Sequence, residues 1–473
     1  MLIKTDQDAI RSYFEDSSNL KGGHAERAAF PEDINALSEL IKEANEKHIP
    51  VTASGGGTGT TGARIPFGGI AVSLEKMGSI LEVSEKGSFA RVEAGVLVED
   101  LKNECERKGL FYPCHPTERG AFLGGTVATN ASGARSFKYG PTRRYVQRLK
   151  MVLANGEIFE IRRGEKFITK NGPIPIPSYK IPQVKNSAGY YAGEGTDLID
   201  LFIGQEGTLS VITEIDLALV RSPASILSAF VFFKKDADAL TFAAEARTVG
   251  ALSIEYLDEN ALRLLRAKNS NVPADAKASI FFEQEISPDN EDSISNMWLK
   301  LISKHHANPD NTWVAMTDDE AEAFNKLRHS IPESVNEMVR KSGFRKFSND
   351  IAVPEKNFMK MMNFYKDTLK SEKIGHVIFG HIGECHLHVN LLPKNEDEMK
   401  RSEEIYVEFM KKSVSLGGTI SAEHGIGKVR RKYLEIMYGR QGVLEMARIK
   451  KAFDPNWILG LDNIFPKEMV KEV

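Results

Sequence analysis

Apolar residues recur at helical spacing in two stretches of the first 110 residues. In residues 31–48 they share one face and follow Asp33, a residue type that commonly caps helix N-termini. A second amphipathic stretch covers residues 98–108 and ends at Gly109. Short apolar runs between and after them predict strands at residues 50–53, 70–74, 80–83 and 90–94, and a hairpin of 151–154 with 157–161 about Asn155-Gly156. This order predicts an α+β fold rather than a regular βαβ alternation.

The pattern changes near residue 222. Beyond it we expect a strand at residues 226–233, a helix at 237–249 and a strand at 252–256. This alternation predicts a separate α/β layer, and helical patterns predominate in the final sixty residues. We therefore expect three regions, which span residues 1–221, 222–410 and 411–473.

Composition narrows the class of protein. The 473 residues include 62 Lys and Arg and 65 Asp and Glu, a net charge of −3, so there is no basic excess to hold a nucleic acid. The three cysteines, Cys105, Cys114 and Cys385, form neither a disulfide framework nor a four-thiolate cluster, which favours the reducing cytoplasm. We find no secretory signal and no apolar run near the ~20 residues that span a bilayer. A peripheral location at the membrane stays open.

Glycines concentrate after the strand predicted at residues 50–53. Residues 54–62 read SGGGTGTTG, and residues 55–69 hold seven glycines, several times their share of the whole chain. Backbone without side chains can approach a diphosphate closely and donate N–H groups to it. The spacing is neither that of a Rossmann fingerprint nor that of a P-loop. A flexible loop is the alternative.

Two further small-residue clusters follow. Residues 124–133 read GGTVATNASG and lead into YGPTR at 139–143, and residues 204–209 read GQEGTL. Taken singly, they are explained equally well by a helix start and a turn. In this order, the three clusters resemble the FAD-binding domain of the vanillyl-alcohol oxidase/para-cresol methylhydroxylase (PCMH) superfamily, over most of residues 20–220 and on to the C-terminus.

The resemblance implies a PCMH-type FAD-binding domain of two α+β subdomains, an α/β cap domain with an antiparallel sheet, and a helical C-terminal segment that completes the active site. No His or Cys matches the covalent attachment positions of the family, so we expect FAD to be held non-covalently. Matching motif positions implies FAD contacts from Ser54, Gly55, Gly56, Gly57, Thr58, Gly59, Thr60, Pro116, Thr117, Gly124, Gly125, Ala128, Thr129, Asn130, Ser132, Gly133, Tyr139, Gly140, Glu206, Gly207, Thr208, Ile212 and Asn463.

Histidines concentrate in the second half of the chain. Four of the 11 lie in residues 376–388, and a strand at 387–391 would place His386, His388 and Asn390 on one face. His381 can fold back from the preceding loop, and residues 421–427 (SAEHGIG) set a carboxylate beside another histidine. Two histidines and one carboxylate suit a catalytic Zn²⁺, Mn²⁺ or Fe²⁺ ion. Hydrogen-bonded core histidines are the alternative.

This half resembles the FAD-linked 2-hydroxyacid dehydrogenases, which include D-lactate dehydrogenases, D-2-hydroxyglutarate dehydrogenase and the flavin-binding component of glycolate oxidase. Their motif GHxGDGNxHxN, with EHGxG further on, implies metal ligands at His381, His388 and Glu423, a catalytic base at His424 and a substrate contact at Asn390. Glu384, Cys385 and His386 stand where the family usually has Asp, Gly and Asn. His386 could bind substrate or act as an extra ligand, and a thiolate ligand at Cys385 stays open.

A substrate carboxylate needs a cation. Residues 324–333 resemble the family's helix with a substrate-binding arginine, which makes Arg328 the first candidate for a bidentate clamp. A solvated helix arginine is the alternative interpretation. Arg64 and Arg143 are further candidates.

Together these features predict an FAD- and metal-dependent enzyme that oxidises a D-2-hydroxy acid (D-lactate, glycolate or D-2-hydroxyglutarate class) to the 2-oxo acid. His424 would take the hydroxyl proton, and the C2 hydride would pass to flavin N5. A quinone, cytochrome, iron–sulfur protein or electron-transfer flavoprotein would accept the electrons, and the chain could form a homodimer or a hetero-complex. The alternatives are a same-fold flavoprotein for aryl alcohols or alkyl-glycerone-phosphate synthesis, the FAD-binding subunit of a larger oxidase, and a metallohydrolase.

Overall fold

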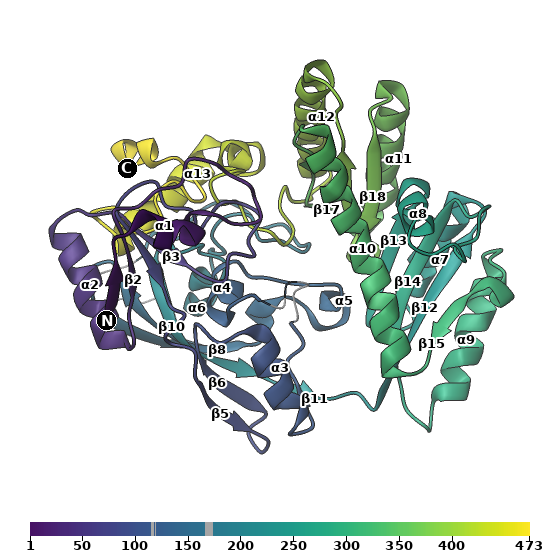
Figure 1. The fold of residues 1–473 in the computed structure, drawn as a ribbon, viewed down its shortest axis with the longest axis horizontal. Helices are drawn as coiled ribbons and strands as arrows, with labels where there is room; N and C mark the ends of the chain where they lie inside the picture. The colour runs from purple at the N-terminus through teal and green to yellow at the C-terminus, as the bar shows by residue number, and fades with distance from the viewer. Residues whose placement is uncertain (115–117, 119, 166–173) are drawn as a thin grey trace.

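The chain forms two lobes in the computed structural model, which describes residues 1–114, 118, 120–165 and 174–473 (Figure 1). The first lobe holds the elements up to β11 (Val220–Arg221), together with α13 (Leu434–Phe453) and the residues after it. The second lobe holds the elements from β12 (Ser225–Phe233) to α12 (Glu396–Ser415). The expected boundary between residues 410 and 411 lies inside α12.

A four-stranded sheet opens the first lobe, in the order β1 (Leu2–Lys4), β2 (Arg27–Phe30), β4 (Ile70–Ser73), β3 (Val51–Ser54). The strands β2, β4 and β3 are parallel. The helix predicted at residues 31–48 is α2 (Ile34–Glu46), whose apolar face is buried, and Asp33 caps it by accepting the Ala36 N–H at 2.9 Å. Short helical turns, α1 (Gln7–Ile10) and η1 (Arg11–Phe14), precede β2.

A five-stranded antiparallel sheet completes the first lobe, in the order β5 (Ile80–Ser84), β6 (Phe89–Glu93), β10 (Ser210–Ala218), β8 (Val146–Leu153), β9 (Ile158–Arg162). The predicted hairpin is therefore present as β8 and β9. The helix predicted at residues 98–108 is α3 (Val98–Glu106). The remaining elements are β7 (Leu110–Phe111), which pairs with β11, α4 (Leu123–Ala128), α5 (Ser136–Tyr139), η2 (Thr142–Arg144) and α6 (Leu198–Phe202).

The second lobe is built on an antiparallel sheet, as expected for the cap domain. Its order is β15 (Trp313–Ala315), β12, β14 (Ala278–Ile286), β13 (Ser253–Asp258), β18 (His376–Gly380), β19 (His386–Leu391), β16 (Phe347–Ser348), and β17 (Ile351–Ala352) also pairs with β19. The strands and helix predicted from residue 226 onward are β12, α7 (Asp236–Ala246) and β13. The other helices are α8 (Glu259–Arg266), α9 (Glu291–Lys304), η3 (Pro309–Asn311), α10 (Asp318–Ser342), α11 (Glu355–Glu372) and η4 (Ile382–Glu384).

After α12 the chain returns to the first lobe. It passes through η5 (Arg431–Tyr433) into α13, drawn in yellow over the first lobe in Figure 1, and η6 (Lys467–Glu472) follows. The Val51 N–H donates to the Ile458 carbonyl at 2.7 Å, and the Gly460 N–H donates to the Val51 carbonyl at 2.8 Å. Residues 458–460 therefore pair with β3 at the edge of the first sheet.

Ion pairs also join the lobes. Arg135, just before α5, binds both carboxylate oxygens of Glu283 on β14, at 2.8 and 2.9 Å. The Lys138 and Tyr139 side chains both bond to Glu285 on the same strand. In the described part of the chain, no helix combines the length and the apolar character needed to cross a bilayer.

The chain after α12, residues 416–473, is called the returning segment. Substitution of Lys450 tests how firmly this segment is attached to the first lobe. The buried Lys450 ammonium on α13 donates to the carbonyls of Thr208 (2.6 Å) and Leu459 (2.9 Å) and pairs with Asp454. Lys450→Met leaves the Asp454 carboxylate buried without its cation, so we expect a loss of about 3–5 kcal/mol in the free energy of unfolding. Urea titration measures it. The exposed neighbour provides the control: Lys451→Met should change stability by less than ~0.5 kcal/mol, and equal losses in the two variants would contradict the assignment.

Candidate functional site

One cavity of about 1140 Å³ reaches both lobes. From the first lobe it is lined by the glycine-rich loop after β3, by the start of α4, and by residues around Glu206. From the second lobe and the returning segment it is lined by Arg328, His381, His388, Asn390, Glu423 and His424. The cavity walls thus include these predicted FAD contacts: Ser54, Gly55, Gly56, Gly57, Thr58, Gly59, Thr60, Gly124, Gly125, Ala128, Thr129, Ser132, Glu206, Gly207 and Ile212.

The loop of residues 55–60 suits a diphosphate. The N–H groups of residues 56–60 donate no hydrogen bond to another described residue, and the buried Ser54 hydroxyl has no partner there either. Glycine is required at two positions: Gly57 has φ +83°, and a Cβ on Gly56 would lie 2.2 Å from the Gly120 carbonyl oxygen. Unpaired N–H donors on a glycine-rich loop are the chemistry that an anionic pyrophosphate needs.

Six of the other predicted FAD contacts lie in the described part of the chain but do not line the cavity. Asn130 accepts the Arg143 N–H at 3.0 Å, and the Thr208 hydroxyl bonds to the Tyr190 hydroxyl at 2.6 Å. The Asn463 amide donates to the Glu206 carbonyl at 2.8 Å. Gly133, Tyr139 and Gly140 also take part in hydrogen bonds within the protein. These residues hold the loops that surround the cavity, whereas Pro116 and Thr117 lie outside the described residues.

Glu206 connects the first lobe to the returning segment. Its two carboxylate oxygens accept the backbone N–H groups of Ile426 (2.8 Å) and Gly427 (2.6 Å). Gly425 has φ +74°, and a Cβ there would lie 2.8 Å from the Glu206 carboxylate. Burial raises the pKa of Glu206 to about 7, although these hydrogen bonds oppose the shift. Glu206 therefore places the residues that directly follow Glu423 and His424.

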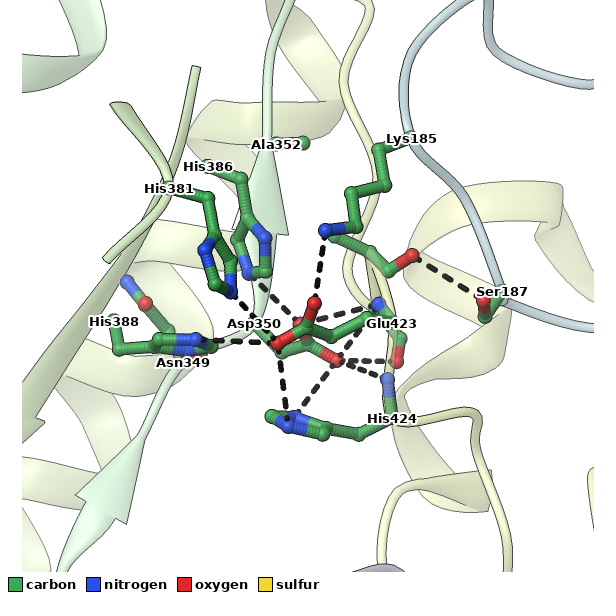
Figure 2. A network of polar contacts seen from close by, with 12 residues as sticks. Lys185, Ser187, Asn349, Asp350, Ala352, His381, His386, His388, Glu423 and His424 are labelled. Atoms are coloured by element: carbon green, nitrogen blue, oxygen red, sulfur yellow. Dashed lines mark hydrogen bonds and ion pairs between the residues drawn. The ribbon is translucent and has the colours of Figure 1, made fainter. Parts of the chain in front are cut away.

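Three histidine side chains converge in the second lobe. His381 follows β18, while His386 and His388 lie on β19, which runs antiparallel to β18 (Figure 2). Gly380 turns the chain with φ +134°, a conformation that favours glycine. The Nε2 atoms of His381 and His388 lie 3.3 and 3.4 Å from the Glu423 Oε1 atom. The predicted strand and the predicted return of His381 toward it are both present.

The buried carboxylate of Asp350 holds the turn that carries Glu423 and His424. It accepts the His424 backbone N–H at 2.9 Å, and its Oδ2 atom lies 3.2 Å from His424 Nδ1 (Figure 2). Arg430 and Ser421 bond to the same oxygen at 2.7 and 2.8 Å. Burial opposes ionisation, but His424 and Arg430 hold the pKa of Asp350 well below its usual range. Asp350 is thus an anion that orients His424.

Glu423 has a cation of its own. The buried Lys185 ammonium lies 2.9 Å from Glu423 Oε2 (Figure 2). It also lies 2.8 Å from Glu384 Oε2. Against the effect of burial, Lys185 and His381 keep the pKa of Glu423 well below its usual range. Burial also acts on the histidines: it lowers the pKa of His386 to about 3, whereas the carboxylates of Glu255 and Glu423 overcome it at His381 and raise that pKa to about 9.

The donor set fits a divalent transition metal. One ligand atom from each of His381, His386, His388 and Glu423 lies within 4.8 Å of the others. A second group of this kind contains Asp350, Glu423 and His424. Imidazole and carboxylate donors suit Zn²⁺, Mn²⁺ or Fe²⁺. The predicted ligands His381, His388 and Glu423 are therefore close enough to bind one ion, and the Cys385 thiol belongs to neither group.

The predicted substrate contacts are placed differently. Arg328 lines the cavity, but its guanidinium binds Glu255 at 2.7 and 3.2 Å. Asn390 lines the cavity and donates to the carbonyls of Val377 and His388, both at 3.3 Å. His386 is fully buried and does not line the cavity.

The two alternative cations are both engaged with the protein. Arg64 lines the cavity and donates to the Gly55 carbonyl at 3.0 Å. Arg143 is bonded within the first lobe to the Asp200 and Ile203 carbonyls.

Sequence patterns missed several functional groups of this site. Lys185 lies in a stretch without periodicity, so no signal marks it. Glu255 interrupts the apolar strand β13, and a charged residue in a buried strand is a signal that could have indicated a charged partner. In the structure Glu255 accepts His381 Nδ1–H at 2.6 Å and binds Arg328. Lys346 lies near a lysine of the resembling family but out of register, so the sequence does not assign it a role. In the structure it lines the cavity, donates to Asn336 Oδ1 at 2.7 Å and makes no ion pair with another described residue.

Two family descriptions match the chain. "FAD binding domain" matches residues 25–162, and "FAD linked oxidases, C-terminal domain" matches residues 222–461. Among curated proteins, the glycolate oxidase subunit GlcD of Bacillus subtilis is 31% identical over 451 residues, which are 94% of this chain and 89% of that protein. The D-lactate dehydrogenase of Archaeoglobus fulgidus is 31% identical and covers 92% of this chain and 90% of its own length.

The fold is also found among solved structures. The 4-ethylphenol oxidase of Gulosibacter chungangensis superposes with a TM-score of 0.73 over 99% of this chain and 95% of its own chain, at 16% identity. This likeness concerns the fold. Together with the match of residues 25–162 to the FAD binding domain, it confirms the predicted α+β fold with an FAD-binding domain.

Glu206 should give the protein a measurable pH dependence. Because its folded-state pKa of about 7 lies above the ordinary value of 4.5, its stabilising contribution is complete below pH 4.5 and is lost as the pH rises through 7. The stability of the wild type minus that of Glu206→Gln should fall by roughly 3 kcal/mol from pH 4.5 to pH 8. Urea titrations at several pH values measure it. The exposed control Glu194→Gln should show no such trend, and a pH-independent difference for Glu206→Gln would refute the assignment.

Proposed function

This chain belongs to the family of FAD-linked oxidases, and from this premise we propose that it oxidises a D-2-hydroxy acid of the D-lactate, glycolate or D-2-hydroxyglutarate class to the 2-oxo acid. One observation carries the proposal: His381, His388, Glu423 and His424 line the same cavity as the glycine-rich loop. A substrate between the loop and these side chains would lie beside both a flavin bound at the loop and a metal bound at the histidines. The matching relatives are named for glycolate and D-lactate oxidation.

FAD and a divalent metal would divide the chemistry. FAD would be held non-covalently by the loop of residues 54–60 and the clusters near Gly124 and Glu206, and would supply a two-electron acceptor for the substrate C2 hydride. A divalent metal would be held by His381, His388 and Glu423 and would supply Lewis acidity, which lowers the pKa of a hydroxyl.

His424 is the proposed catalytic base. Its side chain is 32% exposed, in contrast to the buried histidines, and therefore reaches the cavity. The Asp350 carboxylate, 3.2 Å from Nδ1, would stabilise the imidazolium that forms when Nε2 takes the substrate hydroxyl proton. Because Asp350 also accepts the His424 backbone N–H, it fixes the position of this residue.

Carboxylate recognition is assigned to cations at the cavity wall. Arg328 contributes positive charge while Glu255 holds its orientation. Lys346 also lines the cavity, and burial lowers the pKa of its ammonium to about 8. An ammonium with a reduced pKa and no carboxylate partner gains most from an anionic ligand. We therefore assign Lys346 to substrate binding, together with Arg328 and Asn390, in the cavity that His381 and His388 also line.

Electrons must leave the flavin toward another molecule. The three cysteines, all in the described part of the chain, are buried and form no disulfide. Three thiols do not supply the four thiolates that bind an iron–sulfur cluster. A quinone, cytochrome, iron–sulfur protein or electron-transfer flavoprotein is the proposed acceptor. Because the Bacillus relative is named a subunit, a hetero-complex is part of this proposal.

The substrate class is tested by anaerobic reduction of the bound flavin. The purified protein should show a flavin spectrum that bleaches with one of D-lactate, glycolate or D-2-hydroxyglutarate and not with L-lactate. Prior treatment with EDTA should slow the bleaching, because the metal assists hydroxyl deprotonation. Stopped-flow absorbance measures both rates. A flavin that no 2-hydroxy acid reduces would eliminate the proposed substrate class, while an aryl alcohol that reduces it would favour the alternative flavoenzyme.

The role of His424 is tested by substitution. His424→Ala should lower the rate of flavin reduction by about 10²–10⁴-fold, the usual contribution of a general base, without loss of FAD. The half-buried His376, whose Nδ1 faces the Ile374 carbonyl, provides the control, and His376→Ala should reduce the flavin at the wild-type rate. Near-normal flavin reduction by His424→Ala would overturn the assignment.

A further inference from the structure

His386 departs from the family motif and has no role in the mechanism above. It is the first residue of β19, two residues before His388, but its side chain is fully buried and does not line the cavity. A direct contact with substrate is therefore not available to it. Its burial needs another explanation, because a polar ring in the interior is costly unless its nitrogens have partners.

Only one nitrogen of the His386 ring has a polar partner among the described residues. Asp350 Oδ1 lies 3.0 Å from Nε2, an ion-pair contact between two fully buried side chains. Nδ1 forms no hydrogen bond with a described residue. An unsatisfied buried nitrogen of this kind is typical of a group whose partner is a ligand.

The surroundings of the ring indicate which ligand. The ring centroid of His386 lies 4.6 Å from that of His388 and 5.2 Å from that of His381. A ligand atom of His386 lies within 4.8 Å of ligand atoms of both histidines and of Glu423. Figure 2 shows the His386 and His381 rings side by side above Asp350 and Glu423.

We propose that His386 is a fourth protein ligand of the metal, so that the site of this chain is formed by three histidines and one glutamate. The inference rests on the metal site of the proposed function and extends it. Asp350 would then stand behind His386 as the carboxylate that orients a metal-binding imidazole. Three imidazole donors favour Zn²⁺, Co²⁺ or Ni²⁺ over Mg²⁺ and Mn²⁺, which prefer oxygen.

The first test is direct metal binding by the FAD-loaded protein. Zn²⁺ affinity is measured by competition with a chromophoric chelator for the wild type, His386→Asn and the control His376→Asn. We expect His386→Asn to bind Zn²⁺ at least ~10-fold more weakly, with Mn²⁺ affinity reduced less, and the control to match the wild type. Equal Zn²⁺ affinity in the wild type and a folded, flavin-loaded His386→Asn would overturn the proposal.

The second test needs no variant and decides the question if His386→Asn fails to fold. X-ray absorption spectroscopy of the Zn²⁺-loaded wild type counts the imidazoles around the ion. Three imidazoles would support the proposal. Two imidazoles, or no stoichiometric Zn²⁺, would overturn it. Flavin reduction by a 2-hydroxy acid is followed separately, so two imidazoles in a protein that still reduces its flavin would leave the proposed function standing, whereas absence of reduction would remove that function instead.

Discussion

The site depends on one buried carboxylate, that of Asp350. It lies just before β17 in the second lobe, yet its partners, Ser421, His424 and Arg430, belong to the returning segment. A charge without water must be matched at close range, and Asp350 meets this demand with a guanidinium, a hydroxyl and a backbone N–H. The Glu423–His424 turn thereby has one position relative to the histidines of β18 and β19. Loss of this anion would release both the proposed base and one proposed metal donor.

Charge balance extends outward from there. Glu423 is paired with Lys185 of the first lobe, and His381 and Arg328 share Glu255. Each of these buried ions therefore has an opposite charge within hydrogen-bond distance, and the pair of Lys185 with Glu423 joins the first lobe to the returning segment. Lobe contact and site geometry consequently rest on the same interactions. These buried ion pairs orient the proposed metal donors. They also make the site sensitive to substitution, because removal of one ion leaves its partner unpaired in the interior.

Local patterns predicted much of this molecule. The apolar face of α2, the Asp33 cap and the hairpin about Gly156 depend on neighbours in sequence, so they could be identified from sequence. The glycine-rich loop and the density of histidines in residues 376–388 identified both walls of the cavity for a related reason: each cluster lies within one short segment. Pairings between distant segments could not be found in this way. Lys185 and Glu423 are more than two hundred residues apart, and the engagement of Arg328 by Glu255 depends on how α10 packs against β13. The fully buried position of His386 could not be predicted for the same reason, because the strand pattern only places it on the same face as Asn390.

The pairing of residues 458–460 with β3 has a consequence for biosynthesis. A ribosome produces residues 51–54 about four hundred residues before the segment that covers them. During that interval the edge of a mostly parallel sheet stays open, with unsatisfied backbone groups that can pair with other nascent chains. The first sheet can therefore be completed only after nearly the whole chain has been translated.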